Sequence, residues 1–130
     1  MQLICFDMDG VILKTTNSWS LVHKALGTEK LGEELTENYL KTDYDRLVKE
    51  VVYGLWLNKE ITKVLQIFNN LEYMPYAPEL FAELKKRNYT TVIITSGPNQ
   101  LAERVQKELK IEYIFANKLI FVAISIFSLK

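Results

Sequence analysis

The sequence is poor in the residue types that would mark it as an unusual protein. Its 130 residues include one cysteine, three prolines and five glycines, and 16 basic residues balance 16 acidic ones. A single cysteine excludes an internal disulfide framework and fits a reducing cytoplasm. The balanced charge provides no basic surface for nucleic acid. We therefore expect a cytoplasmic protein that does not bind nucleic acid.

Long hydrophobic runs are also lacking. No run approaches the ~20 apolar residues that a membrane helix needs, so we expect no membrane association. The opening residues, Met-Gln-Leu-Ile-Cys-Phe-Asp, have no basic segment and become acidic too early for a signal peptide. The apolar content of 48% and the charged content of 25% are those of an ordinary globular domain.

What the sequence does contain is a pair of aspartates directly after a short apolar segment, Leu-Ile-Cys-Phe-Asp-Met-Asp-Gly at residues 3–10. We expect residues 2–6 to form a buried strand with Cys5 packed in the core. Carboxylates are tolerated where a strand emerges at its carboxyl end into a crevice that binds ligands. Asp7 and Asp9 would repel each other unless a cation lies between them or one is protonated. The pattern fits a metal site, a nucleophile with an acid/base partner, or both; aspartates that only cap turns are the alternative.

The rest of the chain alternates between helical and strand patterns. Apolar stripes, caps and β-branched runs predict helices at 18–26, 43–55 and 61–71, then a helix at 78–88, a strand at 90–95, a helix at 100–109 and a strand at 113–116. The strand–helix–strand order predicts parallel strands joined by crossover helices.

A second motif repeats the form of the first. Residues 92–98, Val-Ile-Ile-Thr-Ser-Gly-Pro, are an apolar strand that ends in hydroxyl residues and a glycine before a helix. Hydroxyl groups, close backbone approach at Gly97 and the free N–H groups of a helix N-terminus can cradle an oxyanion or a phosphate. A Ser-Gly pair also ends many ordinary strands. Ser96-Gly97 indicates a phosphate site only because its predicted strand is expected to lie beside the strand that Asp7 and Asp9 follow.

In these motifs the chain resembles the haloacid dehalogenase-like phosphohydrolases, specifically their phosphoserine-phosphatase-like branch. The resemblance rests on Phe6-Asp7-Met8-Asp9-Gly10, on Thr95-Ser96-Gly97, on the helix-to-strand passage at 83–89, and on Phe115-Ala116-Asn117-Lys118-Leu119.

The resemblance implies a fold and a domain division. The fold is α/β, a Rossmann-like parallel sheet with helices on both faces. The core comprises residues 1–14 and 75–130, and residues 15–74 form a helical cap inserted after the first strand. The C-terminal part of the family's core is expected to be missing.

The resemblance also implies an activity, that of a magnesium-dependent phosphatase acting on a small phosphorylated metabolite. Asp7 would attack the phosphorus and become an aspartyl-phosphate, while Asp9 would act as the acid/base. Mg²⁺ would be held by the Asp7 carboxylate and the Asp9 backbone carbonyl. Ser96 and the Gly97 N–H would bind phosphoryl oxygens.

Two parts of the family's site have no counterpart here. The sequence has no aspartate after Asp45 and no glutamate after Glu112, so the acidic motif that completes the metal shell is absent. Lys118 matches the basic residue of the Ala-Asn-basic-Leu stretch rather than the catalytic lysine, which favours a solvated strand-end role. The alternative function is therefore a defective relic that binds phosphate or metal, or acts through protein contacts.

Three further expectations concern the cap and the tail. The stretch Thr15-Thr16-Asn17-Ser18 has no acidic residue to meet a substrate amine, which argues against phosphoserine as the substrate. His23 is expected to be a packed or surface histidine rather than a catalytic one. The apolar tail at 119–129 is expected as an interior strand or as an edge strand that pairs with another chain, and it predicts self-association. Such a tail is typical of a truncated or frame-altered gene, or of a shortened family variant.

Overall fold

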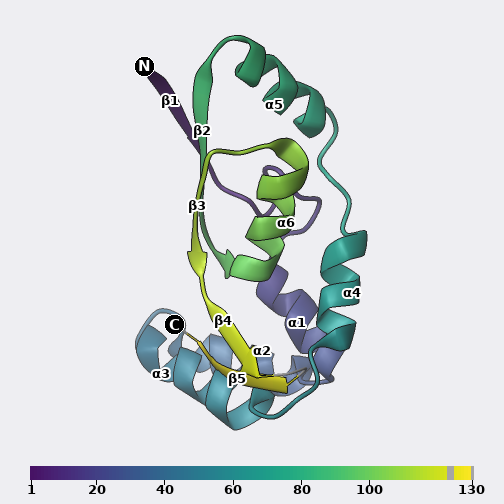
Figure 1. The fold of residues 1–130 in the computed structure, drawn as a ribbon. Helices are drawn as coiled ribbons and strands as arrows, with labels where there is room; N and C mark the ends of the chain where they lie inside the picture. The colour runs from purple at the N-terminus through teal and green to yellow at the C-terminus, as the bar shows by residue number, and fades with distance from the viewer. Residues whose placement is uncertain (123–124, 130) are drawn as a thin grey trace. The chain divides into compact units, whose positions relative to one another are not determined.

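The computed structural model describes residues 1–122 and 125–129 of the chain (Figure 1). It divides into two compact units. Unit 1 comprises Met1–Ser18 and Phe68–Lys118, and unit 2 comprises Trp19–Ile67 and Leu119–Lys130. The sequence had assigned the residues after 118 to the α/β core, whereas the structure groups them with the helices.

Unit 1 is a three-stranded parallel sheet with two helices. The strands β1 (Gln2–Phe6), β2 (Tyr89–Pro98) and β3 (Tyr113–Asn117) lie in the order β1-β2-β3. Helix α5 (Ala77–Lys86) precedes β2, and α6 (Asn99–Leu109) connects β2 to β3. The predicted parallel α/β architecture is therefore confirmed.

Helices α5 and α6 lie on the same side of this sheet (Figure 1). Parallel crossovers are almost always right-handed, and both crossovers here run in the same direction along the sheet, so both helices reach the same face. The Phe6 and Phe81 rings, with centroids 4.7 Å apart, attach α5 to this face. The sequence predicted helices on both faces, and the helices described in unit 1 cover one.

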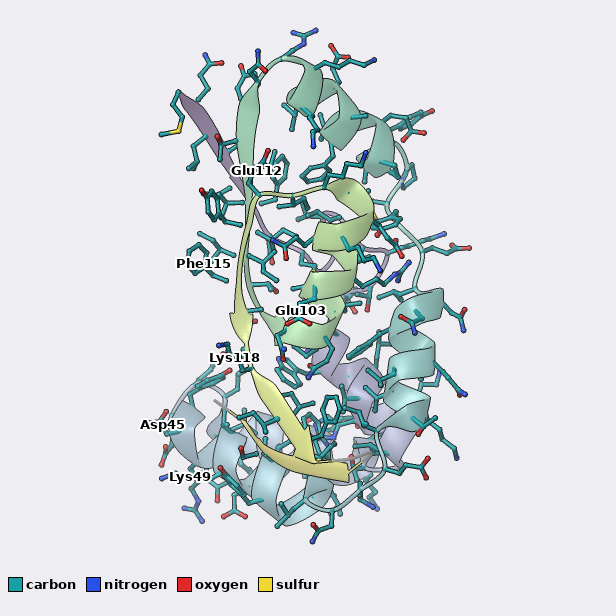
Figure 2. The ribbon with its side chains drawn as sticks, viewed as in Figure 1. Asp45, Lys49, Glu103, Glu112, Phe115 and Lys118 are labelled. Carbon is teal, nitrogen blue, oxygen red and sulfur yellow. The ribbon has the colours of Figure 1, made fainter. Side chains whose placement is uncertain are left out.

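The other face of the sheet is apolar and exposed. Alternation along the strands places Leu3, Ile94, Tyr113 and Phe115 there, with exposures of 54%, 55%, 58% and 62%. Figure 2 shows the Phe115 side chain pointing away from α6. The prediction of a buried first strand with Cys5 in the core is wrong, because Cys5 is exposed. Its strand lies at the edge of the sheet, and alternation turns Cys5 toward the uncovered face.

Arg104 of α6 holds the last turn of α4 (Thr62–Asn70) and the residue that follows it. Its guanidinium Nη1 donates to the backbone carbonyls of Phe68 and Leu71, the latter at 2.8 Å, and its Nε contacts Glu108 at 3.1 Å. The Tyr73 hydroxyl also donates to Glu108. Burial and this hydrogen bond raise the pKa of Tyr73, and the same hydrogen bond lowers the pKa of Glu108.

The helices of unit 2 follow the predicted order, with one addition. They are α1 (Ser18–Leu26), whose first residue belongs to unit 1, α2 (Glu29–Tyr39), α3 (Tyr44–Lys49), the π-helix η1 (Glu50–Trp56), and most of α4. Asp43, the first residue of the helix predicted at 43–55, is the N-cap of α3: its side chain accepts from the Arg46 N–H at 3.0 Å. Helix α2 was missed because its segment is dominated by charged and polar residues.

A small polar cluster lies within the packing of unit 2. Trp56 is 1% exposed, and its indole N–H lies 3.2 Å from the Thr28 hydroxyl and 3.3 Å from His23 Nδ1. His23 Nδ1 in turn lies 2.8 Å from the Thr28 hydroxyl. Gly32 packs so closely that a Cβ there would lie 2.5 Å from the imidazole ring. The expectation of a packed histidine fits this position.

The apolar tail forms an antiparallel hairpin of β4 (Leu119–Val122) and β5 (Ser125–Leu129). The backbone N–H of Ile126 donates to Lys59 O at 2.9 Å, and its carbonyl accepts from Asn58 N at the same distance. The tail therefore pairs within its own chain, and self-association through it stays a prediction. Within residues 1–122 and 125–129, no helix has the length and apolar character required to cross a membrane.

Candidate active site

The carboxyl ends of β1 and β2 meet at one edge of the sheet. The two strands are parallel, and Phe6 at the end of β1 pairs with Ile93 of β2. Asp7 follows directly after Phe6, while residues 94–98 extend β2 beyond the part that pairs with β1. Both predicted motifs therefore emerge at the edge where parallel α/β sheets bind ligands.

The loop after β1 is a tight turn built on Met8. Met8 is fully buried, and its carbonyl oxygen accepts from the N–H groups of Ile12 and Leu13 at 2.9 and 3.0 Å. Gly10 has a φ of +74°, a conformation that residues with a side chain rarely adopt. Its N–H donates to Leu13 O at 3.0 Å. The buried methionine and the turn together fix the aspartates on either side of it.

The two aspartates have different surroundings. Asp7 is exposed, and its Oδ1 accepts from the N–H of Met8 at 2.6 Å. Asp9 is half-buried, and its Oδ2 accepts from the backbone N–H of Ser18 at 2.7 Å. The other oxygen, Asp9 Oδ1, is buried without a hydrogen-bond partner. A buried carboxylate oxygen of this kind is costly unless a donor or a cation reaches it.

The second motif meets the first at Gly97. Gly97 is buried, and its N–H donates to the Thr95 hydroxyl at 3.0 Å. A Cβ at Gly97 would lie 2.8 Å from Ser18 Oγ and 3.0 Å from Met8 Cε. Since Ser18 also holds Asp9, the structure brings Asp9, Ser18 and Gly97 together.

Ser96 lies at the surface beside this cluster. Its side chain is exposed, and its backbone carbonyl accepts from the Asn117 side-chain amide at 2.8 Å. Asn117 is at the end of β3, where it pairs with Pro98. The end of β2 that carries Ser96 is therefore tied to the third strand.

Sequence reasoning assigned no site role to Ser18 or Asn117. Asn117 had a visible signal, because it belongs to the Phe-Ala-Asn-Lys-Leu stretch that carried part of the resemblance. Ser18 was named only as part of the uncharged stretch at residues 15–18, since nothing in the sequence shows that the chain returns to Asp9 nine residues later.

The acidic residues that could hold a metal are few. Within the described part of the chain, no three His, Cys, Asp or Glu side chains are grouped closely enough to form a metal site. Asp7 and Asp9 supply carboxylate oxygens, one of them buried and unpartnered. Mg²⁺ commonly binds one or two protein carboxylates and completes its shell with waters and phosphate oxygens, so this pair fits a partial Mg²⁺ site. Lys118 is exposed at the end of unit 1.

Comparisons with known proteins identify the family. The family model of the haloacid dehalogenase-like hydrolases matches residues 1–127. A phosphoserine phosphatase of Methanocaldococcus jannaschii is 25% identical over 121 residues, which are 92% of this chain and 56% of that protein. One from Wolinella succinogenes is 27% identical over 120 residues, 90% of this chain and 57% of that protein. The chain therefore spans little more than half the length of these two relatives.

Solved structures resemble the fold. A substrate-bound phosphoserine phosphatase complex superposes with a TM-score of 0.84 at 21% identity, covering 99% of this chain and 62% of that one. A HAD-family hydrolase from Salmonella enterica serovar Typhi gives a TM-score of 0.87 at 16% identity, covering 99% of this chain and 45% of that one. At these identities the structural similarity establishes the fold alone.

Proposed function

Because the chain belongs to the haloacid dehalogenase-like hydrolase family, we propose that it is a phosphoric monoester hydrolase acting on a small phosphorylated metabolite. The observation that supports this most strongly is the meeting of the two strand-end motifs. Asp9 is linked through Ser18 to Gly97, at the edge of the sheet where Asp7 also emerges. A nucleophile, an acid/base and a phosphoryl cradle need this kind of juxtaposition.

In the first step, an oxygen of the Asp7 carboxylate attacks the phosphorus, and the bond from phosphorus to the leaving alcohol oxygen breaks. Asp9 gives its proton to that oxygen. In the second step, Asp9 takes a proton from water while the water oxygen attacks the phosphorus. The bond between phosphorus and the Asp7 oxygen then breaks, which releases phosphate and restores both carboxyl groups.

Exposure supports this division of roles. Asp7 is the exposed carboxylate and can reach an incoming phosphoryl group, whereas Asp9 is half-buried and held by a backbone N–H. The Ser96 hydroxyl and the Gly97 backbone belong to the end of β2, which would bind the phosphoryl oxygens.

Magnesium is the cofactor that these oxygen ligands suit. Mg²⁺ would be held by the Asp7 carboxylate and the Asp9 backbone carbonyl, and it would neutralise charge on the phosphoryl oxygens.

Phosphoserine itself is not our preferred substrate. The curated relatives are phosphoserine phosphatases, but residues 15–18 of this chain carry no acidic side chain to meet a substrate amine. We propose a small phosphate monoester without that amine.

The nucleophile can be tested by Asp7→Asn, with Asp45→Asn as a control that removes the same charge. Asp45 lies on α3 and is exposed (Figure 2). Magnesium-dependent hydrolysis of 4-nitrophenyl phosphate should disappear in Asp7→Asn and persist in Asp45→Asn. Equal turnover in the two variants would show that Asp7 is not the nucleophile.

A second function, binding of phosphate or metal without turnover, is favoured by one observation. The described residues bring together no group of three potential metal ligands. Thermal unfolding with Mg²⁺ and beryllium fluoride, a phosphoryl mimic, separates the possibilities. A shift of the melting temperature without hydrolysis supports the binding protein, and a shift together with hydrolysis supports the enzyme. The absence of both would contradict both proposals.

A further inference from the structure

Ser18 is the first residue of α1 and is fully buried. Its backbone N–H donates to Asp9 Oδ2 at 2.7 Å. A hydrogen bond from an N–H to a carboxylate is stronger than one between neutral groups. The N–H of Ser18 therefore fixes which Asp9 oxygen is engaged by the protein.

Two polar atoms beside this hydrogen bond have no partner. Ser18 Oγ and Asp9 Oδ1 are both buried and unbonded. Each belongs to one of the two hydrogen-bonded groups, so both lie within a few covalent bonds of the same N–H···O contact. Buried polar atoms are nearly always satisfied in folded proteins, and a pair of exceptions at one place needs a reason.

Packing alone does not account for the serine. A buried alanine would fill almost the same volume and leave no unbonded hydroxyl, which makes it the better choice for stability. Moreover, Gly97 leaves the space beside Ser18 Oγ free of a side chain, because a Cβ there would lie 2.8 Å from it. The hydroxyl is thus kept next to the backbone of the second motif.

We propose that Ser18 acts together with Asp9: its N–H positions Oδ2, and its hydroxyl hydrogen-bonds the leaving or water oxygen that enters beside Oδ1. Oδ1 is then the oxygen that exchanges the proton with the leaving alcohol or the water. This inference rests on the proposed phosphatase function, which needs Asp9 as its acid/base. Ser18 does not touch the phosphorus.

The activity test compares Ser18→Ala with Ser18→Thr, which keeps the hydroxyl, and with Ser20→Ala, an exposed serine on the same helix. A poor leaving group needs the proton from Asp9 more than a good one does. In Ser18→Ala we expect kcat for phenyl phosphate to fall about tenfold or more, with KM unchanged, because misplaced catalytic groups cost up to ~10²-fold. For 4-nitrophenyl phosphate the fall should be clearly smaller.

Ser18→Thr should recover much of the phenyl phosphate rate, and Ser20→Ala should match the wild type. Equal losses for both substrates in Ser18→Ala, or no loss at all, would overturn the role of the hydroxyl. A Ser18→Ala variant with a wild-type melting temperature excludes misfolding as the cause of any loss.

A measurement without turnover tests the N–H contact separately. The Ser18 amide should exchange slowly with solvent in the wild type and much faster in Asp9→Ala, followed by NMR. Unchanged exchange in Asp9→Ala would overturn the positioning role even in an active enzyme. If the wild type hydrolyses neither phosphate, the phosphatase proposal fails, and slow, Asp9-dependent exchange would still establish the N–H contact.

Discussion

Ile93 and Ile94 are consecutive residues of β2 that point to opposite faces of the sheet. Ile93 is fully buried on the face that α5 and α6 cover, whereas Ile94 is 55% exposed on the other face. Two isoleucines in consecutive positions thus lie in a buried and in an exposed environment. The pair gives a direct measure of how much the covered face contributes to stability.

We expect Ile93→Ala to lower the free energy of unfolding by about 2–4 kcal/mol, because it leaves a cavity in a packed core. Ile94→Ala should cost less than about 1 kcal/mol, since half of that side chain already contacts water. Urea unfolding followed by circular dichroism measures both. Equal losses would mean that the apolar face around Ile94 is covered in solution.

Two arginines test whether burial or ion pairing determines how much an arginine contributes to the free energy of unfolding. Arg104 and Arg87 each contact a glutamate one helical turn away, at 3.1 and 2.8 Å. The Arg104 side chain is only 15% exposed and also donates to the Phe68 and Leu71 carbonyls, whereas that of Arg87 is 67% exposed.

Arg104→Ala should therefore destabilise the protein by about 2 kcal/mol or more, because it leaves two backbone carbonyls without their charged donor. Arg87→Ala should leave the free energy of unfolding nearly unchanged, since exposed ion pairs contribute little. Chemical unfolding of both variants at the same ionic strength compares them. A larger loss in Arg87→Ala would contradict this ranking.

His23 makes the stability depend on pH. Burial lowers the pKa of His23 below its ordinary value of 6.5, and the nearby Glu29 opposes this only in part. The unfolded chain therefore takes up this proton more readily than the folded one. The stabilisation is present above the unfolded pKa and is lost as the pH falls below it and through the lowered folded pKa.

We expect the free energy of unfolding to fall between roughly pH 8 and pH 5, by more in the wild type than in His23→Asn, which cannot titrate there. Both tryptophans, Trp19 and Trp56, stack in unit 2 with ring centroids 5.5 Å apart, so their fluorescence follows its unfolding. Parallel pH profiles in the two proteins would show that His23 is not the group responsible.

Much of unit 1 could be predicted because its signals are local. An apolar run followed by aspartates, and another followed by Ser96-Gly97, indicate strand ends from a few consecutive residues. Parallel pairing then follows from the helices between them. These signals predicted that the two motifs emerge at the same sheet edge, and the register of Phe6 with Ile93 agrees.

The wrong and missed predictions share a different cause, since each depends on contacts with residues that are distant in the sequence. Cys5 was expected in the core because its neighbours are apolar, but whether a strand face is buried depends on the elements that cover it. Ser18 has no sequence mark of its contact with Asp9, which the loop from residue 10 to 17 creates. Helix α2 buries little apolar surface of its own, so its sequence shows no apolar stripe that would predict a helix.

Gly97 should tolerate no side chain. An added methyl group would lie 2.8 Å from Ser18 Oγ, 3.0 Å from Met8 Cε and 3.2 Å from Thr95 Oγ1. Its φ is outside the left-handed region, so the cost of Gly97→Ala comes from these contacts and not from the backbone. We expect a loss of about 1–3 kcal/mol, typical of overpacking. Gly54→Ala is the control, because its nearest neighbour would be Glu50 Oε2 at 3.8 Å and it lies in a helix.

The same substitution made in Ser18→Ala tests which contact dominates. Removing Oγ takes away the nearest atom, while Met8 Cε is the end of a flexible side chain that can move. The cost of Gly97→Ala should then shrink by about 0.5 kcal/mol or more, as expected for residues in contact. Strictly additive losses in the double variant, measured by urea unfolding, would mean that Ser18 and Gly97 do not touch. The link from Asp9 through Ser18 to Gly97 would then be lost, and Met8 alone would join the first motif to Gly97.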